Sequence, residues 1–275
     1  MFLADTISVD SFIMNRAKIV IALISLSLFF SSVECRVSVG LERIQEKPFH
    51  SFFKGKRVGL ITNQTAIDAE LRHAIDIFRD KTELVALFAP EHGLNGVAHA
   101  FEHIKNGRTD DGISIYSLHG ATKRPTAAML QDLDILVYDI QDIGSRSYTY
   151  ITTLFYAMEE AAKNKVAVCV LDRPNPLGGN LVDGTMLEDS WKSFFGHINI
   201  PYCHGMTAGE LAIYFNEEYN VGCDLTVIPM KGWSRDMTFS DTKLPWVPTS
   251  PHIPEETTPF YYPTTGILGE LQMVN

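Results

Sequence analysis

The first feature of the 275-residue sequence that could support chemistry is LFAPEHGLNG, residues 87–96. An apolar run ends in Pro90, and an acid and an imidazole, Glu91 and His92, then stand side by side before Gly93. Glycine lets the backbone turn sharply, so a turn here would hold the Glu91 carboxyl at the end of a strand. A carboxyl shielded in this way can stay protonated and act as a general acid. The competing interpretation makes Glu91 a helix cap or a surface residue and His92 a spacer.

Polar clusters also follow three other apolar runs. They comprise Asn63 after residues 57–62, Asp139, Asp142 and Arg146 around the end of residues 134–140, and Asp172, Arg173 and Asn175 after residues 166–172. Open α/β sheets bind ligands at the carboxyl ends of their parallel strands. The four clusters therefore predict one polar site along one edge of a sheet.

The charged residues of these clusters allow two interpretations. Arg146 either holds an anionic group, while the aspartates bind sugar hydroxyls, or it pairs with Asp142 and braces a loop. The same two alternatives apply to Asp172 and Arg173, and Asn175 can simply build a turn. Sequence alone leaves both open.

Several other chemistries lack support in the sequence. His92, His99 and His103 could be imagined as a metal site, but this spacing is common by chance and no fixed carboxylate accompanies it. The sequence contains no Walker A loop, no G-x-G-x-x-G fingerprint, no G-x-S-x-G elbow and no C-x-x-C pair. We therefore predict no metal and no cofactor.

The elements that must position these residues alternate along the chain. Apolar runs at 57–62, 83–89, 113–118, 134–140 and 166–172 are expected to be strands, and 69–80, 126–133 and 148–165 are expected to be helices. Continuous apolar strands alternating with helices indicate a parallel sheet that is covered on both faces. The predicted fold class is α/β.

The second half of the sequence changes in character. Residues 207–219 predict a helix that begins with a capping box of Thr207 and Glu210, and residues 224–230 predict a strand. Six prolines between positions 245 and 263 predict an irregular, extended segment. We expect a Rossmann-like domain over 36–200 and the start of a smaller, incomplete α/β domain over 201–275.

The N-terminus predicts export. Basic residues at 16 and 18 precede a short apolar run, residues 19–30, which is typical of a secretory signal and too short for a comfortable membrane span. We assign residues 1–35 to this signal, with Cys35 as a candidate lipidation site and an uncleaved membrane anchor as the alternative. Cys203 and Cys223 could pair in an oxidising compartment. The net charge of -10 and the lack of a basic run argue against nucleic acid as a partner.

A family resemblance rests on long motifs in a fixed order. GKRVGLITNQTA, LFAPEHGLNG, YSLHGATKRPTAAMLQDLDILVYDIQDIGSRSYTYI, VLDRPNPLGGNLVDG, HGMTAGELA and YYPTTGILGE resemble the bacterial exo-β-N-acetylmuramidases of the NamZ type. The resemblance runs from about Gly55 to Gly269. It implies an exported glycosidase that removes terminal N-acetylmuramic acid from the non-reducing end of peptidoglycan fragments, so peptidoglycan-derived saccharides are the expected partners. It also implies a Rossmann-like catalytic domain followed by a smaller α/β domain, with the site in the cleft between them.

The resemblance also implies roles for individual residues. Glu91 matches the leading catalytic candidate of the family's Pro-Glu-His-Gly motif, and His92 matches its neighbour. The further motif positions that would line the cleft are Asn63, Asp139, Asp142, Arg146, Asp172, Arg173, Asn175 and His204. Relatives continue after the Thr-Gly turn with a Glu-Gly-Thr-Asn-like segment, whereas this sequence reads ILGELQMVN, so the match of Glu270 to the family glutamate is loose.

The leading hypothesis is therefore an exo-acting glycosidase with Glu91 as its general acid. The second group could be Asp139, Asp142, Asp172, Glu270 or the acetamido group of the substrate. One alternative is a non-catalytic cell-wall or sugar-binding protein of the same fold. Another is a hydrolase with a different substrate that requires a metal.

Overall fold

A seven-stranded sheet forms the centre of the computed structural model, which describes residues 36–99 and 102–269. The strands are β1 (Arg57–Thr62), β2 (Glu83–Ala89), β3 (Gly107–Arg108), β4 (Ser114–Ser117), β5 (Ile135–Asp139), β6 (Ala167–Leu171) and β7 (Leu225–Ile228). Their order is β3-β4-β2-β1-β5-β6-β7, and all neighbours are parallel except β3 with β4. Without β3, this is the order of doubly wound, Rossmann-like sheets. The predicted α/β fold class is confirmed.

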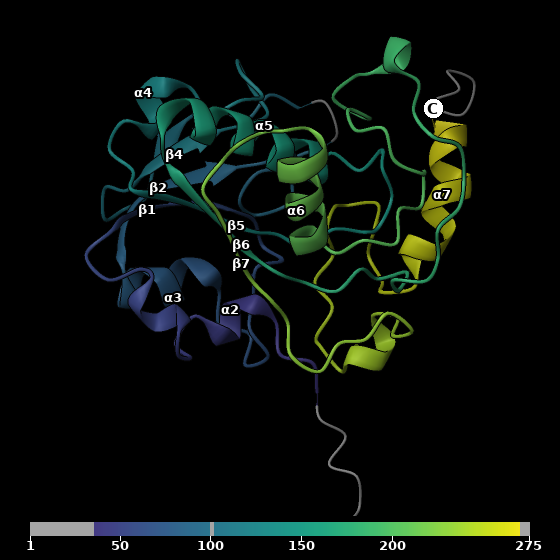
Figure 1. The fold of residues 1–275 in the computed structure, drawn as a ribbon, viewed down its shortest axis with the longest axis horizontal. Helices are drawn as coiled ribbons and strands as arrows, with labels where there is room; N and C mark the ends of the chain where they lie inside the picture. Colours follow the sequence, from purple (N-terminus) through teal and green to yellow (C-terminus); the bar gives the residue numbers. More distant parts are fainter. Residues whose placement is uncertain (1–35, 100–101, 270–275) are drawn as a thin grey trace, which may run out of the picture. The chain divides into compact units, whose positions relative to one another are not determined.

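Helices cover both faces of this sheet (Figure 1). The short helix α2 (Gly40–Arg43) and α3 (Ala74–Lys81) lie on one face, and α4 (Ala127–Leu130), α5 (Tyr150–Asn164) and α6 (Ala208–Glu218) lie on the other. Successive residues of a strand point to opposite faces. In β5, Leu136 and Tyr138 accordingly join the core beneath α5, while Ile135 and Val137 join the core beneath α3. The sheet is thus buried on both faces, as its continuous apolar strands predict.

Helix α3 begins later than the predicted start at residue 69. A loop precedes it, in which the Asp68 carboxylate accepts hydrogen bonds from the backbone of Glu70 (3.0 Å) and Arg72 (2.8 Å). Leu71 has a φ of 62° in this loop, which is incompatible with a right-handed helix. The His73 side chain then accepts a hydrogen bond from the Ile75 N–H at 3.0 Å and caps the helix.

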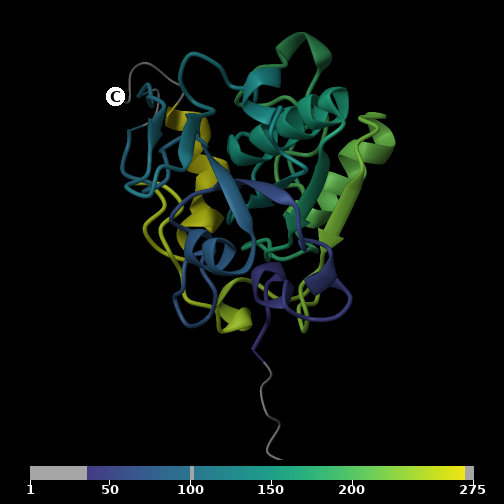
Figure 2. The same cartoon turned by 90° about the vertical axis from the view of Figure 1, so that its left-hand side faces the viewer.

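Strand β7 lies beyond the predicted domain boundary between residues 200 and 201, yet it is the edge strand of the same sheet. Helix α6 leads into it and packs against both β6 and β7, as Figure 2 shows at one side of the sheet. The predicted capping box is present, because the Thr207 side chain accepts from the Glu210 N–H and the Glu210 side chain accepts from the Thr207 N–H. The described residues from Arg36 onward form one compact unit.

The proline-rich segment, which follows the short 3-10 turn η3 (Ser240–Thr242), is irregular as far as residue 257 and then becomes helical. The prediction of an extended chain is wrong for residues 258–263, which open helix α7 (Thr258–Gly269). Pro259 lies in the first turn, where the missing N–H has no partner to lose. Pro263 lies inside the helix and removes one of its hydrogen bonds.

The remaining elements are the 3-10 turns η1 (Phe49–Ser51) and η2 (Asp189–Trp191). Cys203 and Cys223 are free thiols in the structure. No helix of the described part is long and apolar enough to cross a membrane. The predicted signal, residues 1–35, lies outside the described residues.

Candidate active site

Buried polar side chains gather where the parallel strands end. Asn63 follows β1, Glu91 follows β2, His119 follows β4, Asp142 follows β5 and Asp172 follows β6, and all five are buried. Several buried polar atoms along this edge have no hydrogen-bond partner among the described residues: Thr62 Oγ1, Asn63 Nδ2, His119 Nδ1, Asp142 Oδ1, Ser145 Oγ and His204 Nε2. Native proteins satisfy nearly all buried polar groups, so unpaired atoms concentrated at one edge indicate a place built for a ligand or water.

Glu91 has two close polar neighbours. The residue is 4% exposed, and its Oε2 accepts a hydrogen bond of 2.6 Å from the Thr149 hydroxyl at the start of α5. The other oxygen, Oε1, lies 3.6 Å from His119 Nε2, which is longer than a hydrogen bond. One carboxylate oxygen is therefore anchored and the other is left for a reacting group.

A tight turn places Glu91 at the strand end. The Gly93 N–H donates to the Pro90 carbonyl at 3.0 Å, and the two residues that follow Glu91 have positive φ angles, 68° at His92 and 79° at Gly93. A positive φ is uncommon outside glycine, although histidine is among the residues that tolerate it. His92 Nδ1 lies 2.7 Å from the Ala98 carbonyl, so it donates there and holds the turn in place. His92 thus stabilises the loop that carries Glu91.

His119 lies in an apolar setting next to Glu91. Burial lowers the pKa of its imidazole, and the nearby Glu91 carboxylate opposes this shift. The Phe194 ring lies 5.7 Å from the imidazole, centre to centre. A histidine with a lowered pKa is neutral at pH 7, so Glu91 has an uncharged neighbour here rather than a cation.

Asp142 and His204 form a second pair. Asp142 Oδ2 accepts a hydrogen bond of 2.8 Å from the Gly144 N–H and lies 3.7 Å from His204 Nε2. His204 Nδ1 accepts from the Met206 N–H at 3.2 Å, so in the neutral imidazole the proton is on Nε2, which faces Asp142. The pairing of Asp142 with Arg146, one alternative from the sequence, does not occur among the described residues.

Asp139 and Arg173 pair with each other. Arg173 Nε and Nη2 donate to the two Asp139 carboxylate oxygens at 2.5 and 3.1 Å, and Nη2 also donates to the Ile67 carbonyl at 3.1 Å. The guanidinium and the carboxylate meet in the two-pronged geometry that arginine forms with carboxylates. This pair ties the end of β5 to the end of β6 and favours the bracing interpretation of both residues.

Asp172 and Asn175 also stabilise the backbone. Asp172 accepts hydrogen bonds from the Gly209 N–H (2.8 Å) and the Thr207 hydroxyl (3.1 Å) at the start of α6. Burial nevertheless raises the pKa of the Asp172 carboxyl to about 6, against these stabilising donors. Asn175 accepts from the Leu177 N–H at 3.0 Å and donates to the Met206 carbonyl at 3.0 Å, which is the turn-building role.

Arg146 holds the base of a loop. Its Nη1 donates to the carbonyls of Thr185 (2.6 Å) and Ile200 (2.5 Å), which flank residues 186–199. Burial lowers the pKa of its guanidinium, and no carboxylate among the described residues pairs with it. Arg146 therefore braces the base of this loop, and its positive charge has no anionic partner among the described residues.

The last two candidates stand apart. Asn63 Oδ1 accepts from the Thr65 N–H (3.0 Å) and the Thr65 hydroxyl (2.6 Å), which leaves its Nδ2 without a partner. Glu270 lies outside the described residues. In residues 36–99 and 102–269, no three His, Cys, Asp or Glu side chains come together as a metal site would require.

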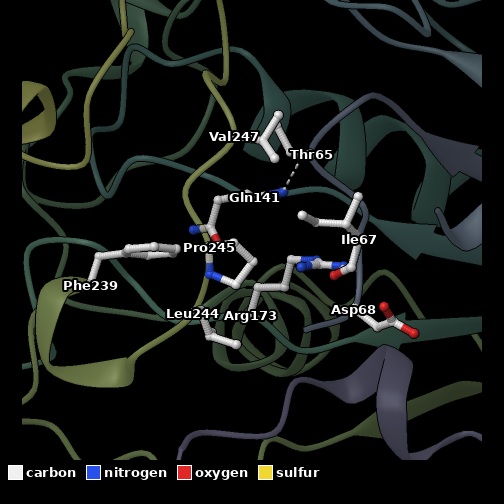
Figure 3. Close-up of a pocket in the computed structure, with 9 residues that line it drawn as sticks. All are labelled: Thr65, Ile67, Asp68, Gln141, Arg173, Phe239, Leu244, Pro245 and Val247. Atoms are coloured by element: carbon white, nitrogen blue, oxygen red, sulfur yellow. Dashed lines mark hydrogen bonds between the residues drawn. The ribbon is translucent and has the colours of Figure 1, made fainter. Parts of the chain in front are cut away.

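A small pocket opens beside this site but does not contain Glu91. Figure 3 shows Arg173, Gln141 and Asp68 around it, with Phe239 on the opposite side. Its cavity volume is about 10 Å³, which is about the room that one water needs. The pocket is too small for a sugar ring, so we assign the candidate site to the buried residues around Glu91 and Asp142.

His119 and Thr149, which contact Glu91 most closely, did not emerge as candidates from the sequence. His119 follows the apolar run 113–118, so it occupies a strand end as Glu91 does, whereas Thr149 stands at the start of a helix. Applied to every strand end, the position rule that marked Glu91 would have found His119. Thr149 carries no such signal, because its contact spans 58 residues of sequence.

A doubly wound α/β sheet with buried carboxyl groups at its carboxyl edge defines a class of proteins that bind small ligands at that edge. Residues 58–257 match the family described as "Exo-beta-N-acetylmuramidase NamZ, N-terminal", and the chain belongs to this family. It is 49% identical over 218 residues to the peptidoglycan beta-N-acetylmuramidase NamZ of Bacillus subtilis (strain 168), which covers 78% of this chain and 53% of that protein.

Two solved structures of DUF1343 family proteins from Bacteroides fragilis NCTC 9343 are also similar. The first has a TM-score of 0.80 and 48% identity, covering 86% of this chain and 61% of that one. The second has a TM-score of 0.72 and 33% identity, covering 86% of this chain and 62% of the other. The chain thus spans about half the length of its curated relative and about three fifths of these two structures.

Proposed function

We propose that the chain is the catalytic part of a glycosidase that releases terminal N-acetylmuramic acid from the non-reducing end of peptidoglycan fragments. The observation that carries the proposal is the buried Glu91 carboxyl, anchored by Thr149 and adjacent to a neutral His119. Family membership and the name of the Bacillus subtilis relative support the substrate class.

Glu91 supplies the proton that glycosidic bond cleavage requires. The leaving oxygen must be protonated as the bond to the sugar breaks, and a carboxylic acid does this in most glycosidases. Thr149 holds one oxygen of Glu91, so the other is directed to the leaving group. Since the neighbouring His119 is uncharged at pH 7, it adds no full positive charge beside the acid.

Arg146 is the candidate for recognising the lactyl carboxylate of muramic acid. Arg173 is fully engaged with Asp139, whereas Arg146 has no carboxylate partner among the described residues. An arginine can clamp a carboxylate through parallel hydrogen bonds. Arg146→Lys should therefore weaken turnover of muramic acid substrates by about tenfold or more relative to N-acetylglucosamine analogues, since a charge-assisted contact contributes about 1.5–3 kcal/mol.

Glu91→Gln tests the proposal directly. The amide keeps the shape of the side chain but cannot protonate a leaving oxygen, so turnover of a muramic acid disaccharide should fall by about 10²–10⁴-fold. A nitrophenyl glycoside needs less protonation and should be cleaved at a rate closer to that of the unsubstituted protein. The measurement is the initial rate of cleavage by protein that is expressed from the complete open reading frame.

Glu217→Gln is the matched control, because Glu217 is exposed and lies in the last turn of α6, at the opposite end of that helix from the contact between Thr207 and Asp172. It should leave both substrates unaffected. Turnover of the disaccharide by Glu91→Gln at the rate of the unsubstituted protein would reject Glu91 as the acid. Binding of the disaccharide without any cleavage by the unsubstituted protein would favour the alternative, a non-catalytic sugar-binding protein of the same fold.

We also propose that the chain is exported to the periplasm or the cell exterior. The support is the basic residues at 16 and 18 followed by the apolar run 19–30. Sequencing the N-terminus of protein from native cells tests this, because export predicts loss of at least residues 14–30. Lipidation at Cys35 would appear in the same experiment as a blocked N-terminal cysteine.

A further inference from the structure

Glycoside hydrolysis usually requires a second carboxyl group besides the acid, and the structure narrows the choice. Both oxygens of Asp139 accept hydrogen bonds from Arg173, and Asp139 is completely buried. Both oxygens of Asp172 accept from groups at the start of α6. Each oxygen of these two aspartates is therefore already held by a donor of the protein.

Asp142 differs from both. One of its oxygens, Oδ2, is held by the Gly144 N–H, while Oδ1 has no partner among the described residues although the side chain is only 7% exposed. Leaving a buried carboxylate oxygen unpaired is costly unless a ligand or water completes it. Of the three aspartates, Asp142 therefore has the free oxygen that a catalytic base needs.

The position of Asp142 in the sheet supports this role. Strand order reverses between β1 and β5, and ligands in doubly wound sheets bind at the carboxyl side of that reversal. Asp142 follows β5 directly, and Glu91 follows β2, on the other side of β1. Two strand spacings separate the β2 and β5 backbones by roughly 10 Å. Side chains that lean inward from such positions can flank one glycosidic bond.

His204 completes the pair. Its Nε2–H faces Asp142 Oδ2 at 3.7 Å and has no hydrogen-bond partner among the described residues. Polar atoms separated by more than about 3.5 Å commonly share a water, and a buried water usually bonds to groups that are otherwise unsatisfied. The unpaired oxygen of Asp142 and the unpaired N–H of His204 are two such groups.

We propose that Asp142 is the catalytic base that activates the attacking water, with His204 as the residue that positions it; this inference rests on the function proposed above. The water oxygen forms a bond to the anomeric carbon and gives one proton to Asp142 Oδ1. The bonding pair of the breaking glycosidic bond goes to the leaving oxygen, which takes its proton from Glu91. The sugar leaves with inverted anomeric configuration, and solvent returns the protons to their starting positions.

The test compares Asp142→Asn with Glu91→Gln on two substrates, a muramic acid disaccharide and a nitrophenyl muramic acid glycoside. Asp142→Asn should lower kcat by about 10²–10⁴-fold on both, because water activation is needed whatever the leaving group. Glu91→Gln should be impaired mainly on the disaccharide. KM should change little for Asp142→Asn, since the amide keeps the shape of the side chain and can still accept from Gly144.

Asp68→Asn is the matched control, because Asp68 is also a buried aspartate but pairs with Arg72 in the loop before α3. It should retain kcat even if it lowers the unfolding temperature, and circular dichroism establishes that each variant is folded. His204→Gln should lower kcat, and it should also move the acidic limb of the pH–kcat profile, which a purely structural role would leave in place.

Two results would overturn the inference while leaving the proposed function intact. One is unimpaired turnover of both substrates by a folded Asp142→Asn. The other is retention of anomeric configuration in the first product seen by proton NMR, which would require a nucleophile in place of a base. Failure of the unsubstituted protein to cleave either substrate would instead contradict the proposed function itself.

Discussion

Replacing Arg173 with alanine should destabilise the fold rather than alter recognition of a substrate anion. The Arg173 side chain is 5% exposed and that of Asp139 is 0% exposed, and two hydrogen bonds of 2.5 and 3.1 Å join them. The alanine variant would leave a fully buried carboxylate without a counter-ion. Removing one partner of a buried pair costs about 3–5 kcal/mol, out of roughly 5–15 kcal/mol for the stability of a whole domain.

Urea unfolding followed by tryptophan fluorescence measures this loss. The double variant Arg173→Met with Asp139→Leu should recover most of the lost stability, because neither charge is then buried alone. Lys163→Ala is the surface control, since Lys163 forms an exposed ion pair with Glu160 at 2.9 Å. Its effect should stay below about 1 kcal/mol.

The refuting result is specific. It is an Arg173→Ala variant that unfolds at the same urea concentration as the unsubstituted protein and loses activity only on muramic acid substrates. The guanidinium would then be free to bind an anion in solution, and the bracing interpretation of the ion pair with Asp139 would be wrong.

Three further changes probe other contacts. Asp172→Asn should gain stability relative to the unsubstituted protein as pH rises from 4 to 7. The folded-state pKa of Asp172, about 6, exceeds the ordinary 3.8, so ionisation of this carboxyl destabilises the unsubstituted protein in this window. The expected difference in chemical unfolding is on the order of 3 kcal/mol. Tyr150→Phe removes a buried 2.7 Å bond to the Thr249 carbonyl and should cost about 1–3 kcal/mol by the same method. Thr149→Ala should lower kcat about tenfold by releasing Glu91, and Thr149→Ser should restore it; equal rates for both variants would contradict this role.

Much of the fold follows from local sequence patterns. The strand bounds 57–62 and 83–89 match the structure because a continuous apolar run must be buried on both faces. The start of α3 could not be predicted in the same way, because the Asp68 carboxylate competes with the helix for the backbone N–H groups around Arg72. Strand β7 likewise joins the sheet through pairing with β6, a contact between segments more than 50 residues apart that no local pattern contains.

The candidate site could also be predicted only in part from the sequence. Residue type and position at a strand end marked Glu91 and three aspartates, Asp139, Asp142 and Asp172, as candidates. Which aspartate keeps a free oxygen could not be predicted, because Asp139 loses both of its oxygens to Arg173, 34 residues away. Sequence patterns locate the edge where chemistry can occur, and tertiary contacts decide which groups there remain unpaired.

Glu91 and Asp142, the two residues that we propose for catalysis, are buried, so the proposed reaction requires a segment around them to move before a sugar can reach them. Residues 248–250 are one candidate segment, because Tyr148 and Tyr150, on either side of Thr149, donate to the Thr249 hydroxyl (2.8 Å) and carbonyl (2.7 Å). Gln64 also donates to the carbonyls of Pro248 (2.8 Å) and Thr249 (3.3 Å). The 186–199 loop is the other candidate, because its Phe194 ring contacts the His119 imidazole, and two charge-assisted bonds from Arg146 hold its base. Neutral hydrogen bonds contribute about 1 kcal/mol each and charge-assisted ones about 1.5–3. The four neutral bonds that hold residues 248–250 and the two charge-assisted bonds that hold the loop base are therefore of similar total strength, about 4 and about 3–6 kcal/mol, so opening either segment requires a comparable free energy.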